Sequence, residues 1–168
     1  IYFEIIEKIK PQISIPLSLK MSHFSAGLSN LVRKLSWTKM IDSIVLFNRY
    51  FNPDIDINNF KITSSGVFST PEDISISLRW IALLSDKVHC NLAASTGVHS
   101  GEGVIKQLLA GATAVQIVSV IYKYGPEYIS TILNDLTTWM EKKNFNSIDD
   151  FRGKLSGKEN TASFERIQ

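Results

Sequence analysis

The chain has 168 residues, of which 44% are hydrophobic and 20% charged, and its formal net charge at pH 7 is +2. That length suits one domain with its own core, and the composition is that of a globular chain rather than a disordered one. The small net charge and the scattered basic residues argue against nucleic-acid binding.

The single cysteine and the lengths of the apolar runs disfavour secreted and membrane proteins. Cys90 is the only cysteine, so no internal disulfide can form, which is typical of a reducing cytoplasm. No apolar run is long enough to predict a membrane-spanning helix, and the charged opening residues do not resemble a signal peptide. The chain starts at Ile1 in what already reads as the middle of a helix. We therefore expect a cytoplasmic protein whose sequence begins inside a larger fold.

The first elements in chain order are a helix, a strand and a second helix. Apolar residues at helical spacing predict a helix over residues 2–10, with Pro11 as its stop. The short apolar and β-branched run over residues 13–22 predicts a buried strand with a polar tip. Helical periodicity returns over residues 25–37, with Ser25 as the expected N-cap.

The middle of the chain contains a second strand and then an irregular segment. Residues 43–48 predict another buried strand with a polar end. Residues 49–69 combine an Asn-Pro step, alternating Ile and Asp, and Gly66. This composition predicts a long excursion with a small strand or hairpin. Thr70 and Pro71 then predict the N-cap and first turn of a helix.

Strands and helices alternate in the remaining sequence. The predicted elements are helix 70–85, strand 89–95, helix 100–111, strand 113–119, helix 125–145 and a short helix over 147–155. Gly111 suits the position just after a helix end. Residues 1–155 are expected to form the folded domain, and residues 156–168 a loose C-terminal tail.

This order amounts to one helix followed by four β–α units. Such alternation predicts an α/β fold with a parallel sheet and helices packed outside it. Four units make either a small open sheet or half of a (βα)8 barrel, and counting elements does not choose between them.

The predicted strands end in polar or small residues. These strand ends carry Lys20, Asn48, the run Ser95-Thr96-Gly97, and Val118-Ser119. In a parallel barrel, functional groups lie at the carboxyl ends of the strands. The pattern predicts a ligand site at the barrel mouth, although strand ends also meet water and are often polar for that reason alone.

Glycines surround the last two strand ends. Gly97, Gly101 and Gly103 lie in the stretch AASTGVHSGEG. Backbone N–H groups at tight turns and helix N-termini bind phosphate, and small side chains let the anion approach. Barrel enzymes often build a phosphate site from the loops after strands seven and eight. Glycines in such turns also serve packing alone, and the stretch is neither a Walker loop nor a complete GxGxxG motif.

The remaining reactive side chains predict little chemistry. His23, His89 and His99 lie in three separate segments without metal-ligand spacing, so we expect no metal site. His99 is expected to be a solvent-exposed loop residue, with a contact to phosphate as the alternative. Cys90 lies inside a predicted strand and is expected to be a small core residue.

Three stretches resemble one family of flavoprotein oxidoreductases. They are NLAASTGVHSGEGVIKQLLAGATAVQIVSVIYKYGPEYI, ISIPLSLKMS and IVLFNRYFNPDIDI. Taken in chain order, they resemble the C-terminal half of the dihydroorotate dehydrogenases, FMN-binding (βα)8 barrels of the soluble class. The resemblance covers roughly residues 10–155 and implies that the chain supplies barrel strands five to eight, with an extra C-terminal helix.

The resemblance implies roles for four residues near the flavin ring. Lys20 matches a lysine at the end of strand five that contacts the flavin, where a cation stabilises negative charge on the reduced ring. Asn48 matches an asparagine that hydrogen-bonds the flavin or the pyrimidine substrate. Phe47 precedes it at a position whose backbone lies beside the flavin. Gly66 falls in the loop where the family has a glycine.

The resemblance also implies a phosphate site. Thr96 and Gly97 fall where the family has a Gly-Gly pair that binds the FMN phosphate. Val118 and Ser119 fall where it usually has Gly-Thr. Ser119 keeps the hydroxyl donor, and backbone N–H groups survive any side chain, but Thr96 and Val118 add bulk beside the phosphate.

The family's catalytic base is a Cys or Ser on a loop after strand four, so the resemblance assigns no catalytic residue to this chain. Removal of the pyrimidine proton requires such a base. The expected function is FMN-dependent oxidation of dihydroorotate to orotate in pyrimidine biosynthesis, with the chain inactive by itself.

Two alternatives remain open. One is a non-catalytic half-barrel that binds phosphate or flavin and pairs with itself or with the missing half. The other is a different phosphate-binding barrel enzyme, such as an isomerase or aldolase.

Overall fold

The computed structural model describes residues 1–50, 52–64 and 66–157, and its centre is one parallel sheet. The sheet order is β1-β2-β5-β6, and all three neighbouring pairs are parallel. The strands are β1 (Ser18–Met21), β2 (Ser43–Leu46), β5 (Asn91–Ser95) and β6 (Ala114–Gln116). The predicted α/β class with four parallel strands is confirmed.

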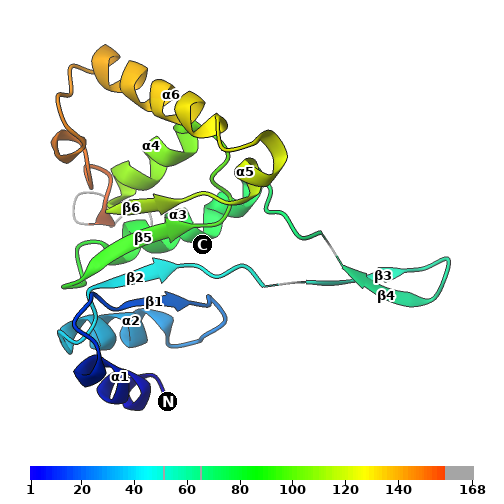
Figure 1. Ribbon diagram of the computed structural model, residues 1–168, viewed down its shortest axis with the longest axis horizontal. Coiled ribbons are helices and arrows are strands. Elements are labelled where there is room, and N and C mark those ends of the chain that lie inside the picture. Colours follow the sequence, from blue (N-terminus) through cyan, green and yellow to red (C-terminus); the bar gives the residue numbers. More distant parts are fainter. Residues whose placement is uncertain (51, 65, 158–168) are drawn as a thin grey trace.

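Helices connect the strands and flank the sheet, with α1 at one end of the molecule and α6 at the other (Figure 1). The helices are α1 (Tyr2–Ile9), α2 (Leu28–Trp37), α3 (Ile74–Leu84), α4 (Gly101–Ala110), α5 (Ser119–Tyr124) and α6 (Tyr128–Lys142). Short 3-10 turns are η1 (Lys10–Gln12), η2 (Pro71–Asp73) and η3 (Ile148–Asp150). None of the helices in the described residues is both long and apolar enough to cross a membrane.

Several predicted elements begin or end at the wrong residue. The predicted strand 13–22 is shorter because Pro16 lacks an N–H for the ladder, and the Leu17 N–H donates instead to the Asp42 carboxylate at 2.7 Å. The N-cap of α2 is Gly27, whereas Ser25 accepts a backbone bond from Leu28.

The region after β6 also differs from the prediction. The predicted strand 113–119 stops at Gln116, and Ser119 begins the unpredicted helix α5. The β-branched residues after Gln116 fit a strand as well as a helix, so the local pattern did not separate the two. Of the predicted helix over 147–155, only the turn η3 forms.

Two apolar clusters hold these layers together. The larger one joins α1, α2 and α3 to the sheet through fully buried residues such as Leu35, Ile44 and Ile81, and Cys90 packs partly buried against it. The smaller one places α6 on α4 around Phe151, whose ring lies edge-on to Trp139 at 5.0 Å. Burial raises the pKa of the Cys90 thiol, as expected for a core cysteine.

The predicted excursion after β2 is a hairpin that projects away from the body (Figure 1). Its strands β3 (Pro53–Asp56) and β4 (Lys61–Ser64) are antiparallel, with Ile55 opposite Ile62. Strand alternation places these two residues on one face, and their side chains are exposed. We call residues 53–64 the arm.

A matched pair of phenylalanine substitutions tests the second cluster. Phe151 is completely buried, so Phe151→Ala should lower the free energy of unfolding by about 3–5 kcal/mol through lost burial and a residual cavity. Phe60, at the tip of the arm, is 91% exposed, and Phe60→Ala should change it by less than about 0.5 kcal/mol. Urea unfolding measures both values. Equal losses from the two variants would contradict the assigned core.

Candidate functional site

The carboxyl ends of the four parallel strands surround a cavity of about 170 Å³, which we call the mouth cavity. Its lining includes all the predicted site residues except Phe47 and Gly66, namely Lys20, Asn48, Thr96, Gly97, Val118 and Ser119. It also includes Arg49, Val67, Ser69, Ser95, Val98 and Gln116. The parallel topology therefore brings together most of the residues that the sequence singled out.

Lys20 spans the mouth from one sheet edge to the other. Its Nζ donates to Gln116 Oε1 at 3.2 Å, although β1 and β6 are the two outer strands of the sheet. Three strand spacings of about 4.8 Å separate such edges in a flat sheet. Side chains that stand out from one face meet over that distance only when the sheet curls toward that face. The contact shows the curvature of a partial barrel.

Asn48 continues the sheet beyond the end of β2. Its backbone N–H donates to the Met21 carbonyl at 2.8 Å, which holds it beside the end of β1. The half-buried side chain lines the mouth cavity, and within the described part of the chain no residue is hydrogen-bonded to its amide. The amide can therefore donate and accept toward a ligand.

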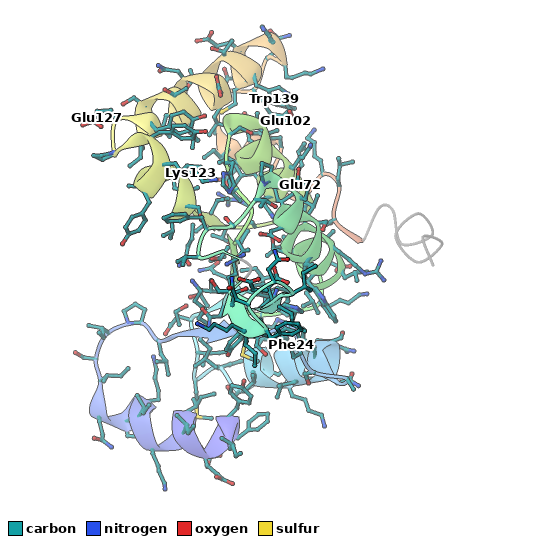
Figure 2. All side chains as sticks on the ribbon, turned by 90° about the vertical axis from the view of Figure 1, so that its right-hand side faces the viewer. Phe24, Glu72, Glu102, Lys123, Glu127 and Trp139 are labelled. Atoms are coloured by element: carbon teal, nitrogen blue, oxygen red, sulfur yellow. The ribbon has the colours of Figure 1, made fainter. Side chains whose placement is uncertain are left out.

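Phe47 and Gly66 lie outside the mouth cavity. Phe47 is 3% exposed, and its N–H donates to the Ser95 carbonyl at 3.3 Å. It lines an adjacent cavity of about 180 Å³ with the aromatic rings of His23, Phe24 and Tyr50, and Phe24 is labelled in Figure 2. Gly66 contributes its carbonyl, which accepts a hydrogen bond from Arg49 Nη1 at 3.1 Å.

The Thr96-Gly97 turn has a left-handed backbone, with φ of 83° and 79°. A Cβ at Gly97 would overlap the backbone of Ile74 and Asp73, so only glycine allows this turn to pack on the start of α3. Thr96 adopts a conformation that favours glycine, and its hydroxyl donates to the Phe47 carbonyl at 3.2 Å. This hydrogen bond turns the Thr96 hydroxyl toward β2.

Gly101 is explained by packing. A Cβ there would overlap the Asp135 side chain, so Gly101 permits the close approach of α4 and α6. Of the three glycines in the predicted phosphate stretch, Gly97 and Gly101 thus have structural reasons that do not involve a ligand.

Ser119 lies at the start of α5 and is tied to a residue that the sequence analysis missed. Its Oγ accepts from the Ser69 N–H at 2.9 Å, and the two hydroxyls are also 2.9 Å apart. Ser69 comes from the end of the excursion and has no strand-end signal, so only the tertiary fold reveals it. Val118, the N-cap residue of α5, is 57% exposed at the rim.

Arg49 is a second missed residue. Its guanidinium donates to the carbonyls of Gly66 and Val67 at 3.1 and 3.0 Å. Its Nε lies 3.5 Å from the Asp73 carboxylate. Arg49 directly follows the polar strand end at Asn48, and this position was the available sequence signal. Arg49 therefore holds the last residues of the excursion beside the mouth cavity.

The expectation of an exposed His99 is wrong. His99 is partly buried, and its Nε2 lies 3.0 Å from Ser69 Oγ. Burial lowers the pKa of His99, with a further contribution from Lys123, against the opposite effects of Ser69, Asp73 and Glu72. Among the residues that the structure describes, no three His, Cys, Asp or Glu side chains group as metal ligands.

The electrostatics of the mouth cavity favour an anion. Its described lining contains the cations Lys20 and Arg49 and no carboxylate. Hydroxyl and amide groups from Ser119 and Asn48 add neutral hydrogen-bonding partners. This donor set suits a phosphate and a polar ring edge.

A curled parallel sheet with a cation-lined cavity at its carboxyl edge defines the class as a partial α/β barrel. The sequence matches the family model described as dihydroorotate dehydrogenase over residues 2–140. The chain belongs to the dihydroorotate dehydrogenase family.

Individual relatives agree with this assignment. The chain is 25% identical over 153 residues to the catalytic subunit of dihydroorotate dehydrogenase B (NAD(+)) of Thermoplasma acidophilum, covering 89% of this chain and 50% of that protein. It is 36% identical over 69 residues to dihydroorotate dehydrogenase A (fumarate) of Lactococcus lactis, covering 41% of this chain and 22% of that protein. The chain thus spans at most half the length of these two relatives.

A solved structure supports the barrel fold. The dihydroorotate dehydrogenase of Eimeria tenella in complex with ferulenol aligns with a TM-score of 0.65 and 17% identity. The alignment covers 83% of this chain and 38% of that one. The fold is therefore part of an α/β barrel, as the sequence predicted.

The donor set fits FMN, but the size of the cavity fits only part of it. Lys20, Asn48 and Ser119 offer a cation, an amide and a hydroxyl, which suit a flavin edge and a phosphate. At about 170 Å³ the cavity is smaller than the roughly 300–1,000 Å³ of typical small-molecule sites. The described residues therefore enclose one portion of such a ligand.

Two glycine substitutions test the turn at the site. Gly97→Ala should lower the free energy of unfolding by about 2–4 kcal/mol, because the new methyl group overlaps backbone and the left-handed φ is strained. Gly103→Ala is the matched control: its Cβ meets side chains no closer than 3.4 Å inside α4. It should be neutral or stabilise by about 0.5–1 kcal/mol. Thermal and urea unfolding compare the two, and a tolerated Gly97→Ala would refute the packing argument.

Proposed function

We propose that this chain supplies the phosphate-binding and flavin-facing half of an FMN-dependent oxidoreductase that converts dihydroorotate to orotate in pyrimidine biosynthesis. One observation carries the proposal: a chain of the dihydroorotate dehydrogenase family gathers Lys20, Asn48 and Ser119 around one anion-favouring cavity at the strand ends. Lys20, Asn48 and Ser119 would hold FMN, which would supply the hydride acceptor for a dihydropyrimidine substrate.

Each residue has a proposed binding role. Lys20 holds a positive charge near the flavin ring, and its hydrogen bond to Gln116 keeps the ammonium in the mouth. Asn48 donates to the ring or to the substrate, and Phe47 lies with its backbone alongside. The residues proposed to hold the phosphate are Thr96, Gly97, Val118 and Ser119. Gly66 acts indirectly, through its carbonyl bond to Arg49.

We further propose that the chain by itself does not turn over substrate. The general base implied by the family resemblance matches no position of this sequence, and proton removal needs one. The small volume of the mouth cavity supports a site shared with further barrel strands. The proposed partner of this site is the other half of the barrel or a second copy of this chain.

Open edges support pairing with another chain or segment. β1 and β6 end the sheet in the described residues, and an unpaired strand edge favours further strand pairing. The same observation favours the alternative function, a non-catalytic half-barrel that binds phosphate or flavin and associates with itself or a partner. We propose a cytoplasmic location, supported by the single, partly buried thiol of Cys90.

Binding of FMN to the chain tests the proposed phosphate and flavin site in the mouth cavity. Quenching of flavin fluorescence should give saturable binding in the micromolar range. Ser119→Asp should weaken it by about tenfold or more, because it sets a carboxylate against the phosphate. Ser130→Asp, on the exposed surface of α6, is the matched control and should leave the affinity unchanged. Absence of binding at millimolar FMN would show that this chain does not hold the cofactor alone.

Turnover distinguishes the two candidate functions. Anaerobic addition of dihydroorotate to the chain with FMN should leave the flavin absorbance unbleached, because no general base is supplied. The dihydroorotate dehydrogenase A of Lactococcus lactis serves as the positive control. Adding the N-terminal half of the Thermoplasma acidophilum relative should restore bleaching if the chain is half an enzyme. Continued inactivity with bound FMN would favour the non-catalytic half-barrel.

A further inference from the structure

Three residues from separate segments meet at the edge of the mouth cavity. Ser69 ends the excursion, His99 lies in the loop between β5 and α4, and Ser119 begins α5. Ser69 Oγ lies 3.0 Å from His99 Nε2 and 2.9 Å from Ser119 Oγ, and Ser69 is only 6% exposed. We call this chain of hydrogen bonds the relay.

Because each hydroxyl has one proton to donate, the hydrogen bonds of the relay can run in two directions. Ser119 Oγ already accepts the Ser69 N–H. If the Ser69 hydroxyl also donates to Ser119, then His99 must donate through Nε2–H, because a hydroxyl has one proton. Ser119 then accepts twice, and its own O–H is free for a ligand. In the reverse direction Ser119 donates to Ser69, Ser69 donates to an unprotonated Nε2, and no hydroxyl donor faces the cavity.

We propose that His99 fixes the first direction, so that the relay runs from His99 Nε2–H through Ser69 to Ser119 and presents the Ser119 hydroxyl hydrogen to an anionic group. This inference rests on the proposed function, because the anion is the phosphate expected in the mouth cavity. His99 and Ser69 are positioning residues: they act on the ligand through Ser119.

Charged neighbours make the relay responsive to pH. The charged groups facing His99 are Lys123 of α5 and the carboxylates of Glu72 and Asp73 on η2; Lys123 and Glu72 are labelled in Figure 2. Burial and Lys123 lower the pKa of His99, so the ring is neutral at neutral pH and its tautomer decides the direction. A bound anion favours the protonated ring, in which Nε2 is always a donor. Anion affinity should therefore rise as the pH falls through the pKa of His99.

The tautomer of His99 can be measured without any ligand. Long-range ¹H–¹⁵N correlation spectra of the unmodified chain at neutral pH should show a protonated Nε2 and an unprotonated Nδ1. The signals are assigned with His23→Gln, His89→Gln and His99→Gln. A protonated Nδ1 with an unprotonated Nε2 would overturn the proposed direction, whether or not the chain binds FMN.

Binding of sulfate, whose charge is constant over the range titrated, tests the consequence. In the unmodified chain the affinity should increase about threefold to tenfold on acidification, the size expected for one charge-assisted hydrogen bond. Ser69→Ala should bind sulfate about threefold to tenfold more weakly at neutral pH and lose the pH response. His99→Gln keeps an amide donor to Ser69, so it should bind nearly normally at neutral pH but with a flat pH profile.

His89→Gln is the matched control, because His89 is exposed and lies just before β5 at the opposite end of that strand from the mouth. It should leave both the affinity and the pH profile unchanged. Circular dichroism checks that each variant folds. Binding of sulfate that is unaffected by Ser69→Ala would overturn the relay but not the proposed phosphate site in the mouth cavity. Binding of neither sulfate nor FMN to the unmodified chain would overturn both.

Discussion

The pairing of β2 with β5 is the constraint on which the site depends. These two central strands run in parallel register, and their contact continues past the strand ends. The Phe47 N–H donates to the Ser95 carbonyl, and the Thr96 hydroxyl donates back to the Phe47 carbonyl. This extension fixes the positions of Asn48 and Gly97 at the mouth. On either side, β1 then adds Lys20, and the segment after β6 adds Ser119.

What was predictable from the sequence is what topology alone dictates. Parallel strands end at one edge, so polar residues at the strand ends, such as Lys20 and Asn48, had to meet once the β–α order was recognised. Ser119 was predicted as a strand end but lies beyond the end of β6, at the start of α5. Ser69 reaches the cavity through the path of a long excursion, which no local periodicity encodes. Arg49 had only its position after the strand end at Asn48 as a signal. The short helix after β6 was missed for a related reason, because β-branched residues fit both structures and tertiary packing decides between them.

The glycine pattern shows how one sequence feature can have two causes. Gly97 and Gly101 each sit where a methyl group would overlap a neighbouring element, so packing against α3 and α6 is enough to explain them. Thr96, next to Gly97, adopts a left-handed conformation, and its hydroxyl donates a hydrogen bond to the Phe47 carbonyl. The case for phosphate at this turn therefore rests on the cations and hydroxyls that line the cavity, and not on the glycines.

Both ends of the excursion that carries the arm lie at the mouth cavity. The excursion leaves the sheet at Asn48 and returns at Ser69, and both residues line the mouth cavity. Arg49 bridges the two ends by binding the Gly66 and Val67 carbonyls. These bonds fix the last residues of the excursion, and Ser69 is held where it meets Ser119. The excursion thus supplies Ser69, the residue proposed to orient the Ser119 hydroxyl at the edge of the mouth cavity.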